Sequence, residues 1–249
     1  MTFRIGQDEN MGYIIALLVM CALYVLFIFL MKYMKNVNLT NALLIGAVFI
    51  PYLMVSITVY RDVGFFDWNF QNTLPVANVS PFMFTLTPIA FLLPKTVKKH
   101  FMLLISLLSV GMLLSGVFGC IYNAARHYKF HIHFIYDYIA HFALSLLGVY
   151  LVKSKQVTVS RRSTLISSSI IVGAATVMLI LNVIFDTAFF GLSLNGKHNI
   201  YNNVLVEDSY LSALIYYVGL CLVLLLGFAY SKLFCRDKGK VSPCEVDKS

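Results

Sequence analysis

The feature that most constrains this chain is a series of seven apolar stretches, each about as long as a membrane-spanning helix. They cover residues 11–31, 41–60, 73–93, 101–122, 134–152, 165–190 and 210–231, and almost all charged residues fall between them. Because a backbone in lipid must satisfy its own hydrogen bonds, these stretches predict α-helices. We therefore expect an all-α polytopic membrane protein built as a seven-transmembrane helix bundle.

The composition supports this class and excludes others. Hydrophobic residues make up 59% of the 249 residues and charged residues 12%, whereas soluble domains carry roughly 45–50% apolar and about 25% charged residues. A water-soluble enzyme and a DNA-binding domain are thereby excluded, so the net charge of +8 does not indicate a nucleic-acid partner. No long linker divides the chain, which predicts a single integral membrane domain over 1–249 with a basic tail over 232–249.

The basic residues between the spans predict the orientation. Of the 19 Lys and Arg residues, fourteen fall in one alternate set of connections and the tail, and five fall in the other set. Since short cytoplasmic loops carry the excess of Lys and Arg, the N-terminus is expected outside and the C-terminus in the cytoplasm. The predicted location is the plasma membrane, crossed several times.

Polar side chains of the third, fifth and sixth spans share one property, which is their position in the outer half of the membrane. They are Asn78, Ser80, His133, Asp137, His141, Asn182 and Asp186. An ionisable group inside the membrane costs roughly 2.5–3.5 kcal/mol on insertion scales, so it must face the bundle interior or a wet cavity. Two interpretations follow: hydrogen bonds between helices, or a shared pocket that opens outward.

The pattern HxHxxxDxxxH over 131–141 is the sharpest candidate site. Residues four apart share one face of a helix, so His133, Asp137 and His141 form a stripe. An aspartate beside a histidine can fix the imidazole tautomer and raise its basicity, as in a general base. We predict His141 as the base, Asp137 as its orienting partner, Ser80 as the nucleophile and Asn78 as the oxyanion donor.

A second set of residues is predicted to bind the substrate around this pocket. The compact polar segment 195–199 could cap the pocket or bind a lipid headgroup through Lys197. The predicted binding residues are His133, Asn182, Asp186, Lys197 and Asn199. No cofactor is expected, although two imidazoles and one carboxylate at His133, Asp137 and His141 could also hold a metal ion.

Three further features carry a resemblance to a known family. They are the run Asn72-Thr73-Leu74-Pro75, the deep His141, and the Asn-Gly-x-x-Asn-x-Tyr stretch over 195–201. Together they resemble the YwaF-type bacterial integral membrane family, which is similar to multi-span acyltransferases and fatty-acid-ester hydrolases. The resemblance implies acyl transfer or lipid-ester hydrolysis, with His141 at the family's histidine position. The family's usual nucleophile position falls near Val79, next to Ser80.

The predicted function is a membrane-embedded hydrolase or acyltransferase that acts on a lipid ester in an outward-facing pocket. Two alternatives stay open. A small-molecule or proton-coupled transporter would use Asp137 and His141 as a proton relay, and a non-catalytic lipid-binding or accessory protein would use the pocket without chemistry. A metal-dependent seven-span hydrolase is a further alternative. The partner expected in every case is membrane lipid.

Overall fold

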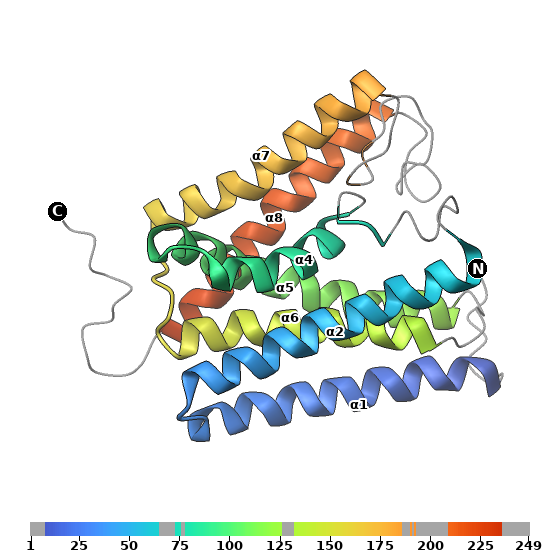
Figure 1. The fold of residues 1–249 in the computed structure, drawn as a ribbon, viewed down its shortest axis with the longest axis horizontal. Helices are drawn as coiled ribbons and strands as arrows, with labels where there is room; N and C mark the ends of the chain where they lie inside the picture. The colour runs from blue at the N-terminus through green and yellow to red at the C-terminus, as the bar shows by residue number, and fades with distance from the viewer. Residues whose placement is uncertain are drawn as a thin grey trace.

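The fold is taken from a computed structural model that describes residues 8–64, 73–75, 78–125, 132–185, 190, 192 and 209–235. Across these residues the chain is helical and holds no strand (Figure 1). The elements are α1 (Asp8–Leu30), the short 3₁₀ helix η1 (Met31–Tyr33), α2 (Val37–Val63), α4 (Val79–Leu92), α5 (Lys95–Ala125), α6 (Ile132–Lys153), α7 (Arg161–Phe185) and α8 (Ser209–Cys235).

Six of the described helices are long and apolar enough to cross a membrane, and they correspond to six of the predicted spans. The third predicted span, 73–93, differs. Its described helix α4 has 14 residues and a length of about 21 Å, short of the roughly 30 Å of a bilayer core. The described helices are therefore those of a multi-pass membrane protein, while the number of spans and their sidedness stay predictions.

Local sequence explains where α4 begins and ends. Asn78 is extended at the N-cap (φ −148°, ψ 162°), and the first turn contains Pro81, which has no N–H to leave unpaired. Leu93 is extended at the C-cap (φ −70°, ψ 157°), because the ring of Pro94 disfavours a helical conformation at the preceding residue. The chain then turns at once into α5, so α4 lies beside the longest helix.

The core of the bundle is the antiparallel pair α5 and α6 (Figure 1). In the most apolar window of each helix, 56% of α5 and 72% of α6 is buried, against 17–22% for α1, α2, α7 and α8. The peripheral helices thus present broad apolar faces outward, which suits lipid and not water. A side chain on α6 consequently has less outward surface available than one on α7.

Small residues allow α5 to approach its two partners closely. A Cβ at Gly148 of α6 would lie 2.6 Å from Ser109 Cβ, and a Cβ at Gly227 of α8 would lie 1.7 Å from the Leu107 carbonyl oxygen. Helices in lipid associate through such close packing. Toward its N-terminal end, α8 tilts away from α5 and α6 (Figure 1). This divergence opens the space in which the candidate site lies.

Candidate functional site

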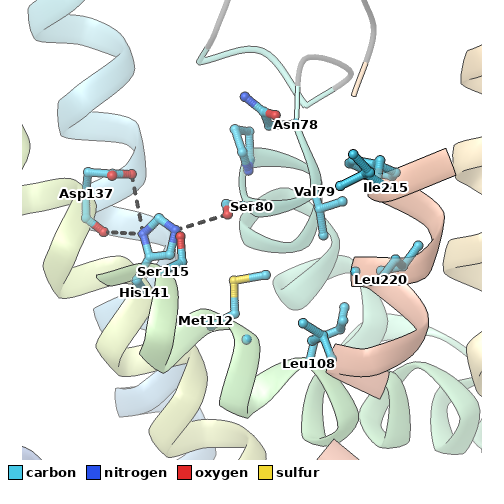
Figure 2. Close-up of a pocket in the computed structure, with 15 residues that line it drawn as sticks. Asn78, Val79, Ser80, Leu108, Met112, Ser115, Asp137, His141, Ile215 and Leu220 are labelled. Atoms are coloured by element: carbon cyan, nitrogen blue, oxygen red, sulfur yellow. Dashed lines mark hydrogen bonds and ion pairs between the residues drawn. The ribbon is translucent and has the colours of Figure 1, made fainter. Parts of the chain in front are cut away.

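A cavity of about 620 Å³ lies between the start of α4, the middle of α5, the first turns of α6 and the N-terminal half of α8. All four residues that the sequence predicts as catalytic line it (Figure 2). The lining consists of Asn78, Val79, Ser80, Pro81, Leu108, Gly111, Met112, Ser115, Asp137, His141, Ile215, Tyr216, Gly219, Leu220 and Val223. Its size falls within the range of roughly 300–1,000 Å³ typical of small-molecule sites.

The central contact of the cavity joins α4 to α6. His141 Nε2 lies 3.0 Å from Ser80 Oγ, a hydrogen bond between residues 61 positions apart in the chain. Figure 2 shows the Ser80 hydroxyl directed at the imidazole ring. This is the distance at which a histidine can remove the proton of a hydroxyl nucleophile.

The backbone of α6 decides which nitrogen of His141 carries the proton. Nδ1 lies 2.9 Å from the carbonyl oxygen of Asp137. A carbonyl only accepts hydrogen bonds, so Nδ1 is the donor, and in the neutral ring Nε2 is left to accept from Ser80. The imidazole is thereby held in the tautomer that a general base requires.

The Asp137 carboxylate plays a smaller part than the sequence pattern predicts. Its Oδ1 lies 3.6 Å from His141 Nδ1, longer than a hydrogen bond. The side chain of Asp137 is 41% exposed, while that of His141 is 7% exposed. The carboxylate can stabilise an imidazolium by its charge at this distance, but the Asp137 carbonyl and not its carboxylate orients the ring.

Packing also fixes the plane of the imidazole. The Phe84 ring meets it edge to face, with centroids 4.9 Å apart and an interplanar angle of 87°. On the other side, α5 comes close enough that a Cβ at Gly116 would lie 3.3 Å from His141 Cβ. A side chain held in this way loses little further freedom when it reacts, which is the preorganisation that catalytic groups need.

The first turn of α4 supplies backbone donors beside Ser80. The first helical bond of this helix runs from Phe82 N–H to the Asn78 carbonyl at 3.1 Å, so the N–H groups of Val79 and Ser80 precede it and have no acceptor within the helix. Asn78, the N-cap residue, makes no side-chain bond to them. These N–H groups carry the partial positive charge of a helix N-terminus, which favours an anion there.

The apolar part of the cavity wall comes from α5 and α8, two helices for which the sequence predicts no site residue. It includes Met112 and Leu108 of α5 and Leu220 and Val223 of α8, and Figure 2 shows Leu220 projecting from α8, on the side of the cavity away from His141. The sequence showed polar groups in three spans, and we expected those spans to meet. The described lining instead combines α4 and α6 with α5 and α8 and includes no residue of α7.

The sequence contains one signal that was overlooked. Ser115 is one of three serines in an apolar span, with Ser106 and Ser109, and it lines the cavity. The signal is weak, because the other two serines only donate hydrogen bonds within α5. Gly219, which also lines the cavity, carries no chemical signal, so only the packing of α8 reveals it.

Asn182, a predicted binding residue, lies elsewhere in the structure. It is buried in α7, and its side-chain amide donates a hydrogen bond to the carbonyl of Leu192. It does not line the cavity. This contact joins α7 to Leu192, and it corresponds to the alternative in which intramembrane amides serve packing.

Other predicted binding residues cannot be compared with the structure. Asp186, Lys197 and Asn199 lie outside the described residues, and for His133 the backbone of α6 is described but the side chain is not. Within the described part of the chain, no three His, Cys, Asp or Glu residues are grouped to hold a metal ion. Because His133 would be the third ligand, the metal alternative stays untested.

A comparison with known protein families, with curated proteins and with solved structures finds no match. The resemblance to the YwaF-type family therefore stays a prediction from its three sequence features.

Proposed function

We propose that the protein is a membrane-embedded serine hydrolase or acyltransferase that acts on a lipid ester. The observation that supports it most strongly is the hydrogen-bonded pair of Ser80 Oγ and His141 Nε2 at 3.0 Å, with the opposite ring nitrogen held by a carbonyl. This arrangement has the parts of an activated nucleophile: hydroxyl, base and orienting group. The acyl chemistry agrees with what the family resemblance implies but does not depend on it.

In the proposed reaction Ser80 Oγ attacks the ester carbonyl carbon while its proton passes to His141 Nε2. The carbonyl electron pair moves onto the oxygen, which the N–H groups of Val79 and Ser80 stabilise, together with Asn78. Collapse expels the alcohol, which takes the proton back from Nε2 and leaves an acyl group on Ser80. Water completes hydrolysis, or a second alcohol completes transfer, when its oxygen attacks the acyl carbon and its proton passes to Nε2. The bond from that carbon to Ser80 Oγ then breaks, and Ser80 takes the proton back from Nε2.

The apolar wall supports a lipid substrate. The acyl chain would lie against Met112, Leu108 and Leu220, while the ester group would reach the polar side at Ser80. An aliphatic chain brings no polar group that such a wall would leave without a hydrogen-bond partner, so it is a favourable occupant. With the predicted orientation, the cavity faces the outer leaflet.

The test is covalent labelling of the purified protein with an alkyl fluorophosphonate, a reagent that traps activated serines. Wild-type protein should be labelled at Ser80, and Ser80→Ala should remove the label. His141→Ala should slow labelling by about 10²–10⁴-fold, the usual contribution of a general base. Ester hydrolysis should fall in parallel in both variants.

Matched controls separate chemistry from folding. Ser106 is buried in α5, and its hydroxyl donates only within the helix, to the Met102 carbonyl. Ser106→Ala should therefore keep wild-type labelling. His100, near the beginning of α5, does not line the cavity, so His100→Ala should keep it as well. Absence of label from folded wild-type protein would contradict the proposal, as would equal labelling of Ser80→Ala.

A second candidate is a lipid-binding protein without catalysis. One observation favours it: the Asp137 carboxylate is 3.6 Å from the imidazole and makes no hydrogen bond to it, unlike the aspartate of a serine protease triad. In that case acyl lipid would copurify in the cavity, and folded protein would show neither label nor turnover.

A further inference from the structure

A second hollow, of about 480 Å³, lies on the other side of α8, between α8 and α7. Figure 1 shows these two helices diverging toward the end where α7 begins. The walls are formed by Leu165 and Val172 of α7 and by Leu224, Leu225 and Phe228 of α8. Leu165 and Leu225 are strongly exposed, so this α7–α8 groove is open to whatever surrounds the bundle.

A positive charge lies at one end of this groove. Arg161, the first residue of α7, lines it and is exposed. Its guanidinium group belongs to the end of the groove at which the apolar walls on α7 begin.

A hydroxyl lies between the cation and the apolar walls. Thr164, less than one turn from Arg161, lines the groove, and its Oγ1 is buried with no hydrogen-bond partner among the described residues. A buried polar atom without a partner is costly. A ligand with an oxygen acceptor at this depth would relieve that cost and would meet Arg161 at the same time.

From this arrangement we infer that the α7–α8 groove binds one anionic phospholipid, with its phosphate at Arg161 and Thr164 and an acyl chain along the apolar walls. Arg161 provides donors that suit phosphate geometry. A packed helix of another protein would fill the apolar walls but would leave Thr164 and Arg161 without an acceptor. The inference does not depend on the proposed catalysis, because α8 separates this groove from the cavity.

The test is native mass spectrometry of the full chain in detergent, with phosphatidylglycerol and phosphatidylcholine of identical chains offered together. The Ser80→Ala background is used so that no turnover consumes lipid. The parent protein should retain phosphatidylglycerol in preference. Arg161→Gln should lower that preference by about fivefold, the effect of one basic residue at an anionic surface.

The neighbouring arginine provides the matched control. Arg162 is also exposed but does not line the groove, so Arg162→Gln should leave the preference unchanged. Thr164→Val should lower retention of both lipids, since both carry the phosphate. Leu225→Trp should reduce binding of both lipids by filling the groove, with Arg161 intact.

Two results would overturn the inference. One is equal loss of preference in Arg161→Gln and Arg162→Gln, which would indicate a diffuse basic surface. The other is unchanged retention in Leu225→Trp with normal thermal unfolding, which would place the lipid outside the groove.

Discussion

Gly219 and Gly227 lie about two helical turns apart on α8, yet they meet α5 in opposite ways. At Gly227 an added Cβ would lie 1.7 Å from a backbone oxygen of α5, whereas at Gly219 it would meet nothing within 4 Å. Gly227 therefore lies where α8 packs directly against α5, which we call the closed end of the α5–α8 contact. Gly219 lies beside the cavity, at the open end of that contact. The same residue type thus marks both the point where α8 contacts α5 and the point where it has moved away.

The hydroxyl groups near the closed end and near the open end also differ, in the partners of their hydrogen bonds. At the closed end, Ser106 and Ser109 donate to carbonyls of their own helix. At the open end, the Ser80 hydroxyl instead reaches the imidazole of another helix beside a cavity. A hydroxyl bonded within its helix is a packing feature, and one that bridges helices at a cavity is available for chemistry.

The largest expected effect is at the closed end. Gly227→Ala puts a methyl group against the backbone of α5 at Leu107, so the two helices must separate. We expect a loss of stability above the roughly 1–3 kcal/mol of ordinary overpacking, seen as a lower unfolding temperature and less monodisperse protein. Gly173→Ala, where the added Cβ meets nothing within 4 Å, is the control. Equal unfolding temperatures for the two variants would contradict this account of the closed end.

At the open end, Gly219→Leu should alter selectivity and not folding. The new side chain extends into the cavity, where long acyl chains are proposed to lie. The ratio of kcat/KM for a long-chain ester to that for a short-chain ester should fall by about tenfold or more. Gly173→Leu, on α7 and away from the cavity, should keep the wild-type ratio. If Gly219→Leu leaves the ratio unchanged, the acyl chain does not lie against α8.

A smaller effect is expected at Asp137. Because its carbonyl holds His141 Nδ1, Asp137→Asn keeps the tautomer and removes only the charge 3.6 Å away. We expect kcat/KM to fall by about tenfold or less, in contrast to the roughly 10⁴-fold loss when the buried aspartate of a serine protease is replaced by asparagine. A loss of that larger size would show that the carboxylate orients the ring after all.

The smallest effect on turnover is expected at Asn182, which the sequence places at the depth of the site and the structure places outside it. Asn182→Ala removes the donor to the Leu192 carbonyl and should cost about 1–3 kcal/mol of stability. Turnover per folded molecule should follow that of the wild type. A raised KM at an unchanged unfolding temperature would instead restore the binding role expected from the sequence.

These contrasts show why part of the site could be predicted. Asp137 and His141 are four residues apart, so helix geometry alone brings them together. The pairing of His141 with Ser80 was predictable only as a shared depth, because two spans at one depth need not be neighbours. Asn182 has the same predicted depth, but its side chain hydrogen-bonds to Leu192 and does not line the cavity. Depth therefore identifies candidate residues, and the packing of the helices determines which of them meet.

The sequence by itself determined the local features: long apolar helices, the break before Pro94, and the stripe that carries His141. These follow from hydropathy and from backbone geometry within a few residues. Only the tertiary structure decided that α8 tilts away from α5, that the cavity forms in the resulting space, and that a carbonyl and not a carboxylate holds the imidazole. The reason is physical: contacts between helices depend on the side chains of both partners, and no single stretch of sequence contains both.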